Sequence, residues 1–166
     1  MHFKGCYDDS VSGILQNIDK KVEKMCDGLK DTLVIVTADH GHCDLENLIL
    51  SDYPNIVKML KRPISIEARA IGFHVKEEYL LQFPVEFQET FPDDFLLLSQ
   101  KQMLEQQIFG NGVPHQKFFD FVGDYMAVAV ADKGIVNSNI SNKFKSNHAG
   151  MTEKEMAIPF IAIEAK

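Results

Sequence analysis

The sequence contains no apolar run that approaches the roughly 20 residues needed to cross a bilayer. Its first ten residues, MHFKGCYDDS, have no apolar core and do not read as a signal peptide. The three cysteines, Cys6, Cys26 and Cys43, are an odd number without CxxC spacing, which argues against a disulfide framework. We therefore expect a cytoplasmic protein that has no membrane partner.

Positive charge is also scarce, because the formal net charge is −7 at pH 7. Binding to a nucleic acid polymer or an anionic membrane requires a basic face, so we expect neither partner. A small anionic substrate stays compatible with this charge if metal ions neutralise it locally. Segment 109–114 contains two glycines but lacks the GK[ST] ending and a preceding strand, so it is not a phosphate-binding loop.

The 166 residues suffice for one domain with a sizeable core, and a hydrophobic content of 45% is typical of a globular protein. Apolar residues recur every three or four positions over 10–30, which predicts an amphipathic helix. A β-branched run over 33–38 predicts a buried strand directly after it. A helix followed by a buried strand is half of an α/β repeat. Further segments predict helices from 44–50 and 55–60, and strands at 124–131 and 157–164.

The character of the sequence changes near Pro63, which cannot continue a helix. From there the pattern alternates between strands at 68–75 and 93–99 and helices at 76–90 and 100–108. We therefore predict an α/β core with a mostly parallel sheet, built from residues 1–63 and 120–166. A small α+β lobe, residues 64–119, would be inserted between the two core segments.

Metal-capable side chains follow the predicted strand at 33–38, where the sequence reads Ala38-Asp39-His40-Gly41-His42. In open α/β sheets, ligands bind just beyond the carboxyl ends of strands. A carboxylate beside an imidazole suits a divalent cation such as zinc or manganese, and Gly41 allows the turn that would let both side chains reach one ion. The alternative is a structural turn in which Asp39 caps a helix and His40 is hydrogen-bonded.

Other histidines are weaker candidates when taken alone. His148 lies in a loop before a Thr152-x-x-Glu155 pattern that resembles a capping box, which could hold it rigidly. His2 lies at the edge of the sequence. We expect His42, and with it Asn147, to support the ligands from outside or to lie at the surface.

Together these motifs resemble the alkaline phosphatase superfamily. The order is His2-x-x-Gly, a helix, a strand ending in Thr-Ala-Asp-His-Gly-His, a small lobe, and then Asn147-His148-Ala-Gly-Met before a last strand. The resemblance is greatest to type I phosphodiesterases and nucleotide pyrophosphatases, and it extends to cofactor-independent phosphoglycerate mutases. It covers nearly the whole chain but only the C-terminal part of the family's domain.

The resemblance implies two divalent metal ions, Zn or Mn, in the parent enzyme. Asp39 and His40 would hold one of them, and His148 and His2 the other. The nucleophilic threonine or serine and further aspartates would lie upstream of this sequence, so the chain carries no catalytic nucleophile. We therefore expect the C-terminal fragment of a metal-dependent hydrolase of small phosphate esters or diesters, inactive by itself and with partial metal occupancy or none.

Two other readings stay open. A phosphoglycerate-mutase-like isomerase would share the metal ligands but would need an arginine-rich pocket, and the sequence has only Arg62 and Arg69. A noncatalytic metal-binding or oligomerising module would keep the ligands as remnants. A truncated sheet exposes an edge and apolar surface, which a homodimer would cover.

Overall fold

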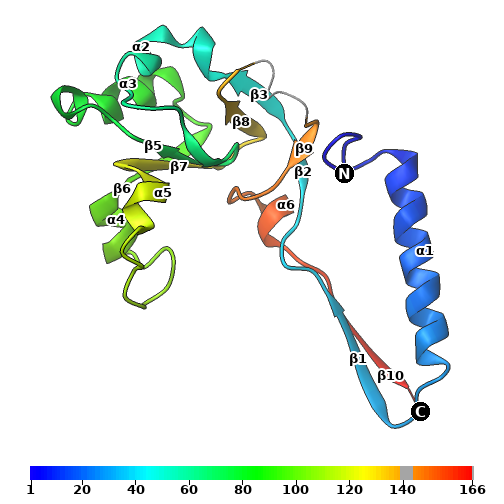
Figure 1. Cartoon of the computed structure of the whole chain (residues 1–166). Coiled ribbons are helices and arrows are strands. Elements are labelled where there is room, and N and C mark those ends of the chain that lie inside the picture. Colours follow the sequence, from blue (N-terminus) through cyan, green and yellow to red (C-terminus); the bar gives the residue numbers. More distant parts are fainter. Residues whose placement is uncertain (139–143, 166) are drawn as a thin grey trace. The chain divides into compact units, whose positions relative to one another are not determined.

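The structure is a computed structural model that describes residues 1–138 and 144–165 (Figure 1). Its internal contacts divide the chain into two compact units. Unit 1 consists of Met1–Asp44, Phe144–His148 and Glu153–Lys166, and unit 2 consists of Leu45–Lys143 and Ala149–Thr152.

Unit 1 begins with the long helix α1, Asp9–Cys26. The Asp8 carboxylate caps it by accepting a hydrogen bond of 2.9 Å from the backbone N–H of Ser10. This helix confirms the prediction for 10–30 except for its last turn. The other elements of unit 1 are β1 (Thr32–Thr37), β2 (Cys43–Asp44), β9 (Ser146–Asn147), the one-turn helix α6 (Glu153–Met156) and β10 (Phe160–Ala165).

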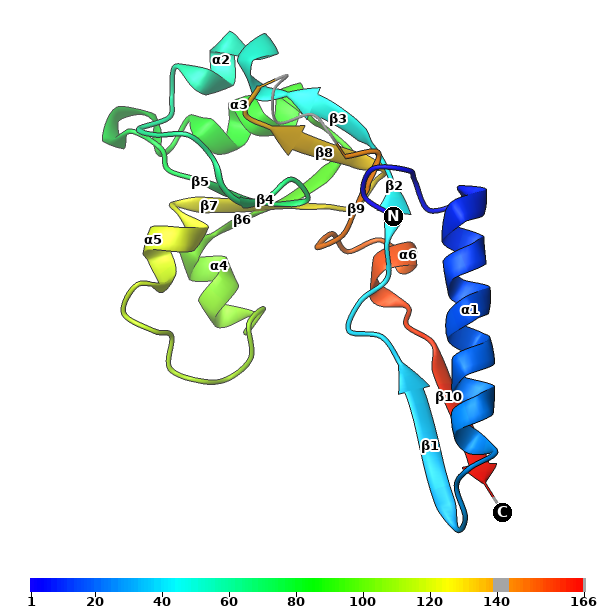
Figure 2. The ribbon, with the colours of Figure 1, turned by 45° about the vertical axis from the view of Figure 1, so that its right-hand side comes forward.

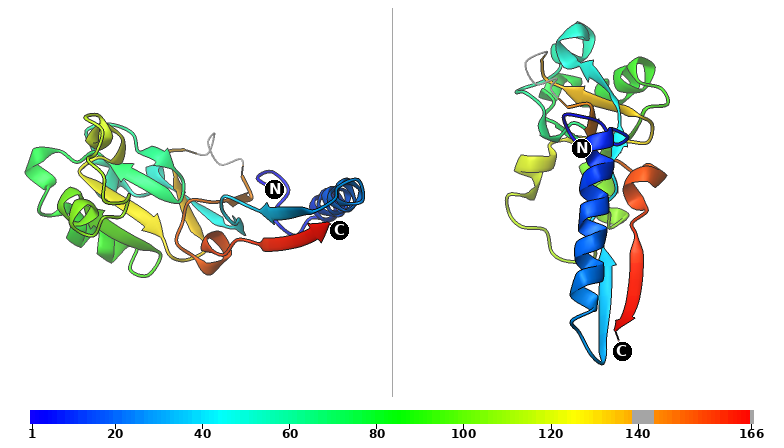
Figure 3. Two further views of the ribbon diagram at one scale, coloured as in Figure 1. Left: turned by 90° about the horizontal axis from the view of Figure 1, so that it is seen from below. Right: turned by 90° about the vertical axis from the view of Figure 1, so that its right-hand side faces the viewer.

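Strand β1 forms a two-stranded antiparallel ribbon with β10, in which Thr32 lies opposite Ala165 and Thr37 opposite Phe160 (Figure 3). The prediction of a mostly parallel sheet is therefore wrong for the described residues. Their sheets are small, and only the pair β3–β8 joins two named strands in parallel. An apolar run shows that a strand is present, but it does not fix the direction of the neighbouring strand.

The prediction that 33–38 is a buried strand also needs correction. Side chains along β1 alternate between half-buried and exposed, with Leu33 at 64% and Ile35 at 51% exposure. Within the described residues β1 pairs with β10 alone. A ribbon of two strands covers neither of its own faces, so these apolar side chains stay in contact with solvent.

Unit 2 is built around an antiparallel sheet with the order β4-β5-β7-β6. Figure 2 shows helices on both sides of this sheet, with α2 and α3 on one side and α4 and α5 on the other. Strands β3 and β8 form a separate parallel pair. The elements are β3 (Glu46–Ile49), α2 (Pro54–Val57), β4 (Ser65–Glu67), β5 (Ala70–Phe73), α3 (Phe83–Thr90), β6 (Phe95–Ser99), α4 (Gln100–Glu105), α5 (Phe118–Val122), β7 (Tyr125–Ala129) and β8 (Lys133–Val136), with 3-10 turns at Leu50–Asp52 and Glu77–Tyr79.

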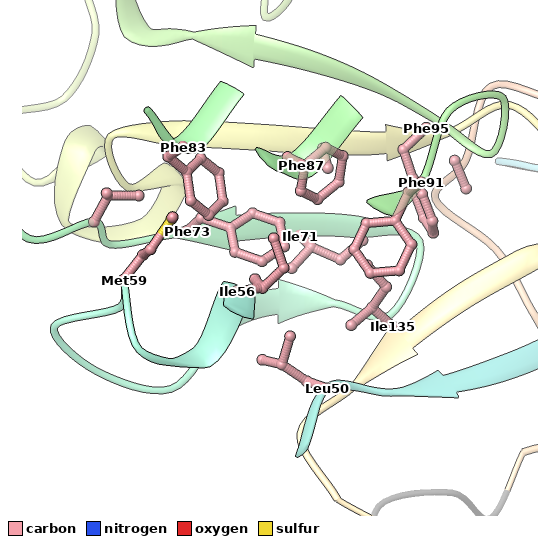
Figure 4. Close-up of a cluster of buried hydrophobic side chains, with 13 residues drawn as sticks. Leu50, Ile56, Met59, Ile71, Phe73, Phe83, Phe87, Phe91, Phe95 and Ile135 are labelled. Atoms are coloured by element: carbon pink, nitrogen blue, oxygen red, sulfur yellow. The ribbon is translucent and has the colours of Figure 1, made fainter. Parts of the chain in front are cut away.

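An aromatic core stabilises unit 2 between the sheet and α3 (Figure 4). The ring centroids of Phe83 and Phe87 lie 5.3 and 5.4 Å from that of Phe73, and Phe91 continues the row at 5.0 Å from Phe87. Edge-on and tilted pairs at these separations add to the free energy gained by burying the rings. Unit 2 therefore has the core that the composition predicts.

Segment 44–50, which we predicted to begin a helix, instead forms the strands β2 and β3. Its apolar residues are too few to distinguish the two kinds of structure, and pairing with β9 and β8 decides between them. The predicted lobe, 64–119, supplies β4, β5 and β6, and two of these strands pair with β7, which lies in the predicted core segment 120–166. An insertion with the boundaries 64 and 119 stays a prediction.

The three cysteines are free thiols in this structure, and Cys43 is buried. Among the described residues, no helix combines the length and the apolar character that crossing a membrane requires.

Candidate metal centre

The short antiparallel pair β2–β9 in unit 1 brings the predicted ligands together. Cys43 lies opposite Asn147 and Asp44 opposite Ser146. In an antiparallel pair, the residues before one strand and those after the other meet at the same end. His40 and His42 precede β2 and His148 follows β9, so the pairing accounts for their proximity across more than a hundred residues of sequence.

Four imidazole rings form a cluster at this end, from His2, His40, His42 and His148. The ring centroids of His40 and His148 are 4.0 Å apart, and that of His42 is 4.7 Å from His2 and 5.6 Å from His148. His2 lies 5.5 Å from His148. The predicted ligands His2, His40 and His148 therefore lie side by side, together with His42, which we expected to act from outside or to lie at the surface.

Asp39 and His40 lie at the solvent-exposed side of the cluster. The Nδ1 atom of His40 is 2.7 Å from the carbonyl oxygen of Gly41, so this nitrogen must carry the proton that it donates. In the neutral ring, Nε2 then keeps its lone pair. It is 3.7 Å from Oδ1 of Asp39. Because zinc lies about 2 Å from each N or O ligand, two donors closer than about 4 Å can share one ion.

The backbone of Lys145 and Ser146 holds His2 in place. The carbonyl oxygen of His2 accepts a hydrogen bond of 2.7 Å from the backbone N–H of Lys145, and its Nδ1 donates to the carbonyl oxygen of Ser146 at 3.0 Å. In the neutral ring of His2, as in that of His40, Nε2 therefore keeps a lone pair that could bind a metal ion. Metal-binding histidines commonly donate their other ring N–H to a backbone carbonyl in this way.

His42 is a half-buried ring of the cluster. Burial, together with the neighbouring imidazoles of His2 and His148, lowers the pKa of His42 to about 4. Its Nδ1 lies 3.7 Å from Sγ of Cys6, and its Nε2 is buried without a hydrogen-bond partner among the described residues. A buried nitrogen of a neutral imidazole that has no hydrogen-bond partner could instead bind a cation.

Backbone contacts fix both loops that carry the histidines, the loop around Gly41 and the loop that begins at His148. The backbone N–H of Gly41 donates to the carbonyl oxygen of Glu155 in α6 at 2.7 Å. A Cβ atom at position 41 would lie 1.9 Å from the carbonyl oxygen of Lys154, so only glycine fits. In the second loop, the side-chain oxygen of Asn147 accepts a hydrogen bond of 3.0 Å from the backbone N–H of His148 and so holds the start of that loop.

The donor types therefore fit a divalent cation, but the described residues do not assemble one complete site. Among them, no group of three or more His, Cys, Asp or Glu side chains is arranged to hold a metal ion. The rings of His40 and His148 stack with their planes 19° apart. Lone pairs in two stacked rings point along their own planes and do not converge on one ion.

The structure adds residues that the sequence analysis did not single out. Cys6 lies beside His42, and its backbone N–H donates to Oδ1 of Asp44 at 2.6 Å. Burial and then the Asp44 carboxylate raise the pKa of the Cys6 thiol. The buried hydroxyl of Ser146 lies near this thiol and acts in the opposite direction on its pKa. The only signal in the sequence is that these residues flank His2, His42 and Asn147.

No protein-family model matches the chain, and no curated protein matches it by sequence. Solved structures do match in fold, and the chain corresponds to a part of each of them. The resemblance predicted from the sequence motifs is thereby confirmed at the level of the fold.

The similar structures include murine ectonucleotide pyrophosphatase/phosphodiesterase 5, with 17% identity and a TM-score of 0.71. The human protein of that name has 16% identity and a TM-score of 0.71. Each match covers 97% of this chain and 43% of the other. Phosphonoacetate hydrolase from Sinorhizobium meliloti, in complex with phosphonoformate, has 14% identity and a TM-score of 0.56, and the match covers 92% of this chain and 40% of the other. The chain thus spans less than half of the length of these proteins.

Proposed function

We propose that this chain supplies the C-terminal part of a metal-dependent phosphoric ester hydrolase of the phosphodiesterase type. The observation that carries the proposal is the cluster of His2, His40 and His148 with Asp39 beside it, in a fold that resembles an ectonucleotide pyrophosphatase/phosphodiesterase. One of the matched structures is an inactive variant of the murine protein in complex with AMP. A small phosphate ester or diester is the substrate class that we propose for the whole enzyme.

In this proposal Asp39 and His40 hold one divalent cation, and His2 and His148 hold a second. Two bound divalent cations stabilise the charge that develops on the attacking and leaving oxygens of a displacement at phosphorus. The stacking of His40 against His148 agrees with two separate ions, because lone pairs in near-parallel ring planes do not converge on one ion. Backbone carbonyls hold the rings of His2 and His40 with Nε2 available.

The chain contributes ligands and their support, and we propose that the nucleophile belongs to residues outside this sequence. Each predicted metal has two ligands here, whereas a catalytic zinc typically has three protein ligands. We therefore expect weak metal binding and no turnover by the 166 residues alone. Hydrolysis of a phosphodiester that copurifies with the chain, and that Asp39→Ala abolishes, would contradict this expectation.

Metal analysis tests the proposal directly. We expect the purified chain, dialysed against zinc or manganese, to retain metal in elemental analysis, and His148→Ala and Asp39→Ala each to lower the retained amount at least severalfold. His115→Ala is the matched control, because His115 is an exposed histidine in unit 2, outside the cluster. Retention that is equal in all four proteins would show that the cluster does not bind metal.

The structure does not favour a mutase-like isomerase. Arg69 is fully buried, and its guanidinium donates to the carbonyl oxygens of Ala131 and Lys133. Arg62 lies against the ring of His74 and donates to the carbonyl oxygen of Asp120. Both guanidinium groups thus make structural contacts in unit 2.

A chain that retains no metal and forms a stable homodimer would instead support the noncatalytic module.

A further inference from the structure

Unit 2 contains an apolar trough beside the segment that connects α4 to α5, which is the long loop at the lower left of Figure 2. The trough consists of two adjoining cavities, with volumes of about 430 and 370 Å³. They share the side chains of Phe109, His115 and Phe118. Cavities of this size are typical of sites for small molecules.

The walls of the trough are mostly apolar and open to solvent, although Gln107 and Asn111 are polar members of the first cavity. Phe109 is 56% exposed, Phe121 is 64% exposed and Val113 is 98% exposed. The rings of Phe109 and Phe118 meet edge to face with their centroids 5.1 Å apart, which fixes the wall between the two cavities. Apolar side chains gathered around a hollow mark a binding surface more often than apolar side chains scattered singly do.

The charge of the lining is unlike that of the whole chain. The sequence has 24 Asp and Glu residues against 17 Lys and Arg residues, yet no acidic residue is among the described residues that line either cavity. The charged or titratable side chains in the lining are Lys117 and His115. The backbone N–H of Lys117 donates to Nδ1 of His115 at 3.2 Å, so the neutral ring carries its proton on Nε2 and is a hydrogen-bond donor there.

We infer that the trough binds an amphipathic anion with a linear apolar chain, represented by a medium-chain fatty acid. Two cavities in a row fit a flexible chain better than a single compact ring. A carboxylate at the rim complements the ammonium group of Lys117 and the N–H of His115. This inference does not depend on the histidine cluster or on bound metal, because the trough belongs to unit 2 and the cluster to unit 1.

Calorimetric titration of the whole chain with decanoate, below the concentration at which it forms micelles, tests the inference. We expect saturable binding of one molecule per chain. Decanol, which has the same chain without the charge, should bind about two- to fivefold more weakly, since an exposed ion pair contributes little. Lys117→Gln should remove this preference for decanoate.

A variant of the apolar wall separates this site from nonspecific binding. Phe109→Ser should weaken the binding of decanoate and of decanol alike by about tenfold, because it removes part of the buried apolar contact. Val113→Ser changes the same wall at a fully exposed position, where a serine should not disturb folding. It should weaken the binding of both ligands less than Phe109→Ser does. Leu81→Ser is the matched control, because Leu81 is 93% exposed in unit 2 but lines neither cavity.

The inference fails if wild-type chain shows no saturable heat, or if Phe109→Ser, Val113→Ser and Leu81→Ser all bind decanoate as the wild type does. It also fails if the chain self-associates through this surface, so that Phe109→Ser yields monomers while decanoate does not bind to either form. Circular dichroism of each variant shows whether lost binding reflects the site or a loss of fold.

Discussion

At the scale of single residues, the glycine in the metal-ligand loop is as important as the ligands. Gly41 links Asp39 and His40 to His42, and its Cα faces the carbonyl oxygen of Lys154 so closely that a side chain has no room. The sequence analysis assigned Gly41 a different role, that of allowing the chain to turn. The contact with α6 joins segments that are more than a hundred residues apart, so no local pattern could have revealed it.

We expect Gly41→Ala to lower the free energy of unfolding of unit 1 by about 1–3 kcal/mol, because a Cβ atom 1.9 Å from a backbone oxygen forces the backbone to shift. Gly13→Ala is the control. Gly13 lies inside α1 with nothing within 4 Å of its Cβ position, so alanine should stabilise the helix by about 0.5–1 kcal/mol. Urea unfolding of both variants measures the two effects. Equal changes of the same sign would contradict the close contact in this structure.

His74 gives a residue-scale prediction for unit 2. Burial and then the guanidinium of Arg62 lower the pKa of His74 from 6.5, so the folded state favours the neutral ring while the unfolded state binds a proton more readily. Asp124 and Asp120 oppose this shift, and Lys61 reinforces it. The stabilisation is therefore complete above about pH 6.5 and is lost as the pH falls toward the lowered pKa.

We expect urea unfolding midpoints of the wild-type chain to fall between pH 7 and pH 5, and His74→Gln to make this fall smaller. His115→Gln replaces an exposed histidine and should leave the pH dependence as it is in the wild type. If His74→Gln and the wild type show the same pH dependence, the neutral ring does not contribute to stability.

At the scale of elements, the sequence predicted which segments are regular better than it predicted how they pair. The amphipathic helix over 10–30 and the strand over 33–38 are present as α1 and β1. Periodicity is a local signal, and it placed this helix, although the sequence favoured Ser10 or Ser12 as its cap and the structure has Asp8 there. Strand direction depends on contacts between distant segments, which is why the antiparallel pairing of β1 with β10 was not foreseen.

Replacement of the α1 cap tests how strongly one hydrogen bond supports the element. Asp8→Ala should lower the urea midpoint of unfolding, because the backbone N–H of Ser10 loses its acceptor. Asp8→Asn keeps an acceptor oxygen and should recover most of that loss. Helical circular dichroism during urea unfolding measures both variants. Equal losses in the two variants would assign the effect to the charge of Asp8 and not to the cap.

At the scale of the whole molecule, the two units differ in how much apolar surface they bury. Among the described residues, the buried apolar side chains of unit 1 are Val11, Cys43 and Ala165, whereas unit 2 contains both hydrophobic clusters, with Phe73 and Val128 among their members. The metal candidates were named from local sequence motifs, and metal binding by them stays a prediction. The uneven division of the core could not be predicted from the sequence, because apolar residues are common in both units.

Hydrogen exchange measures this difference. We expect the amides of β5 and β7 to exchange slowest, and those of α1 and of the β1–β10 ribbon to exchange at least tenfold faster, because few buried contacts resist their opening. Zinc should slow exchange around His40 and His148 while leaving β5 and β7 unchanged. Uniform protection across both units would show that unit 1 has stability that its own buried contacts do not explain.

The placement of the histidine cluster on the unit with the smaller core has a consequence for the behaviour of the protein in a cell. A ligand that binds the folded state alone stabilises it by mass action, and the resulting change in the folded fraction is greatest where intrinsic stability is low. If the histidine cluster binds metal as proposed, that binding would also help to fold unit 1. The abundance of intact chain would rise and fall with the supply of the ion, and a shortage would be detected first as degradation by proteases.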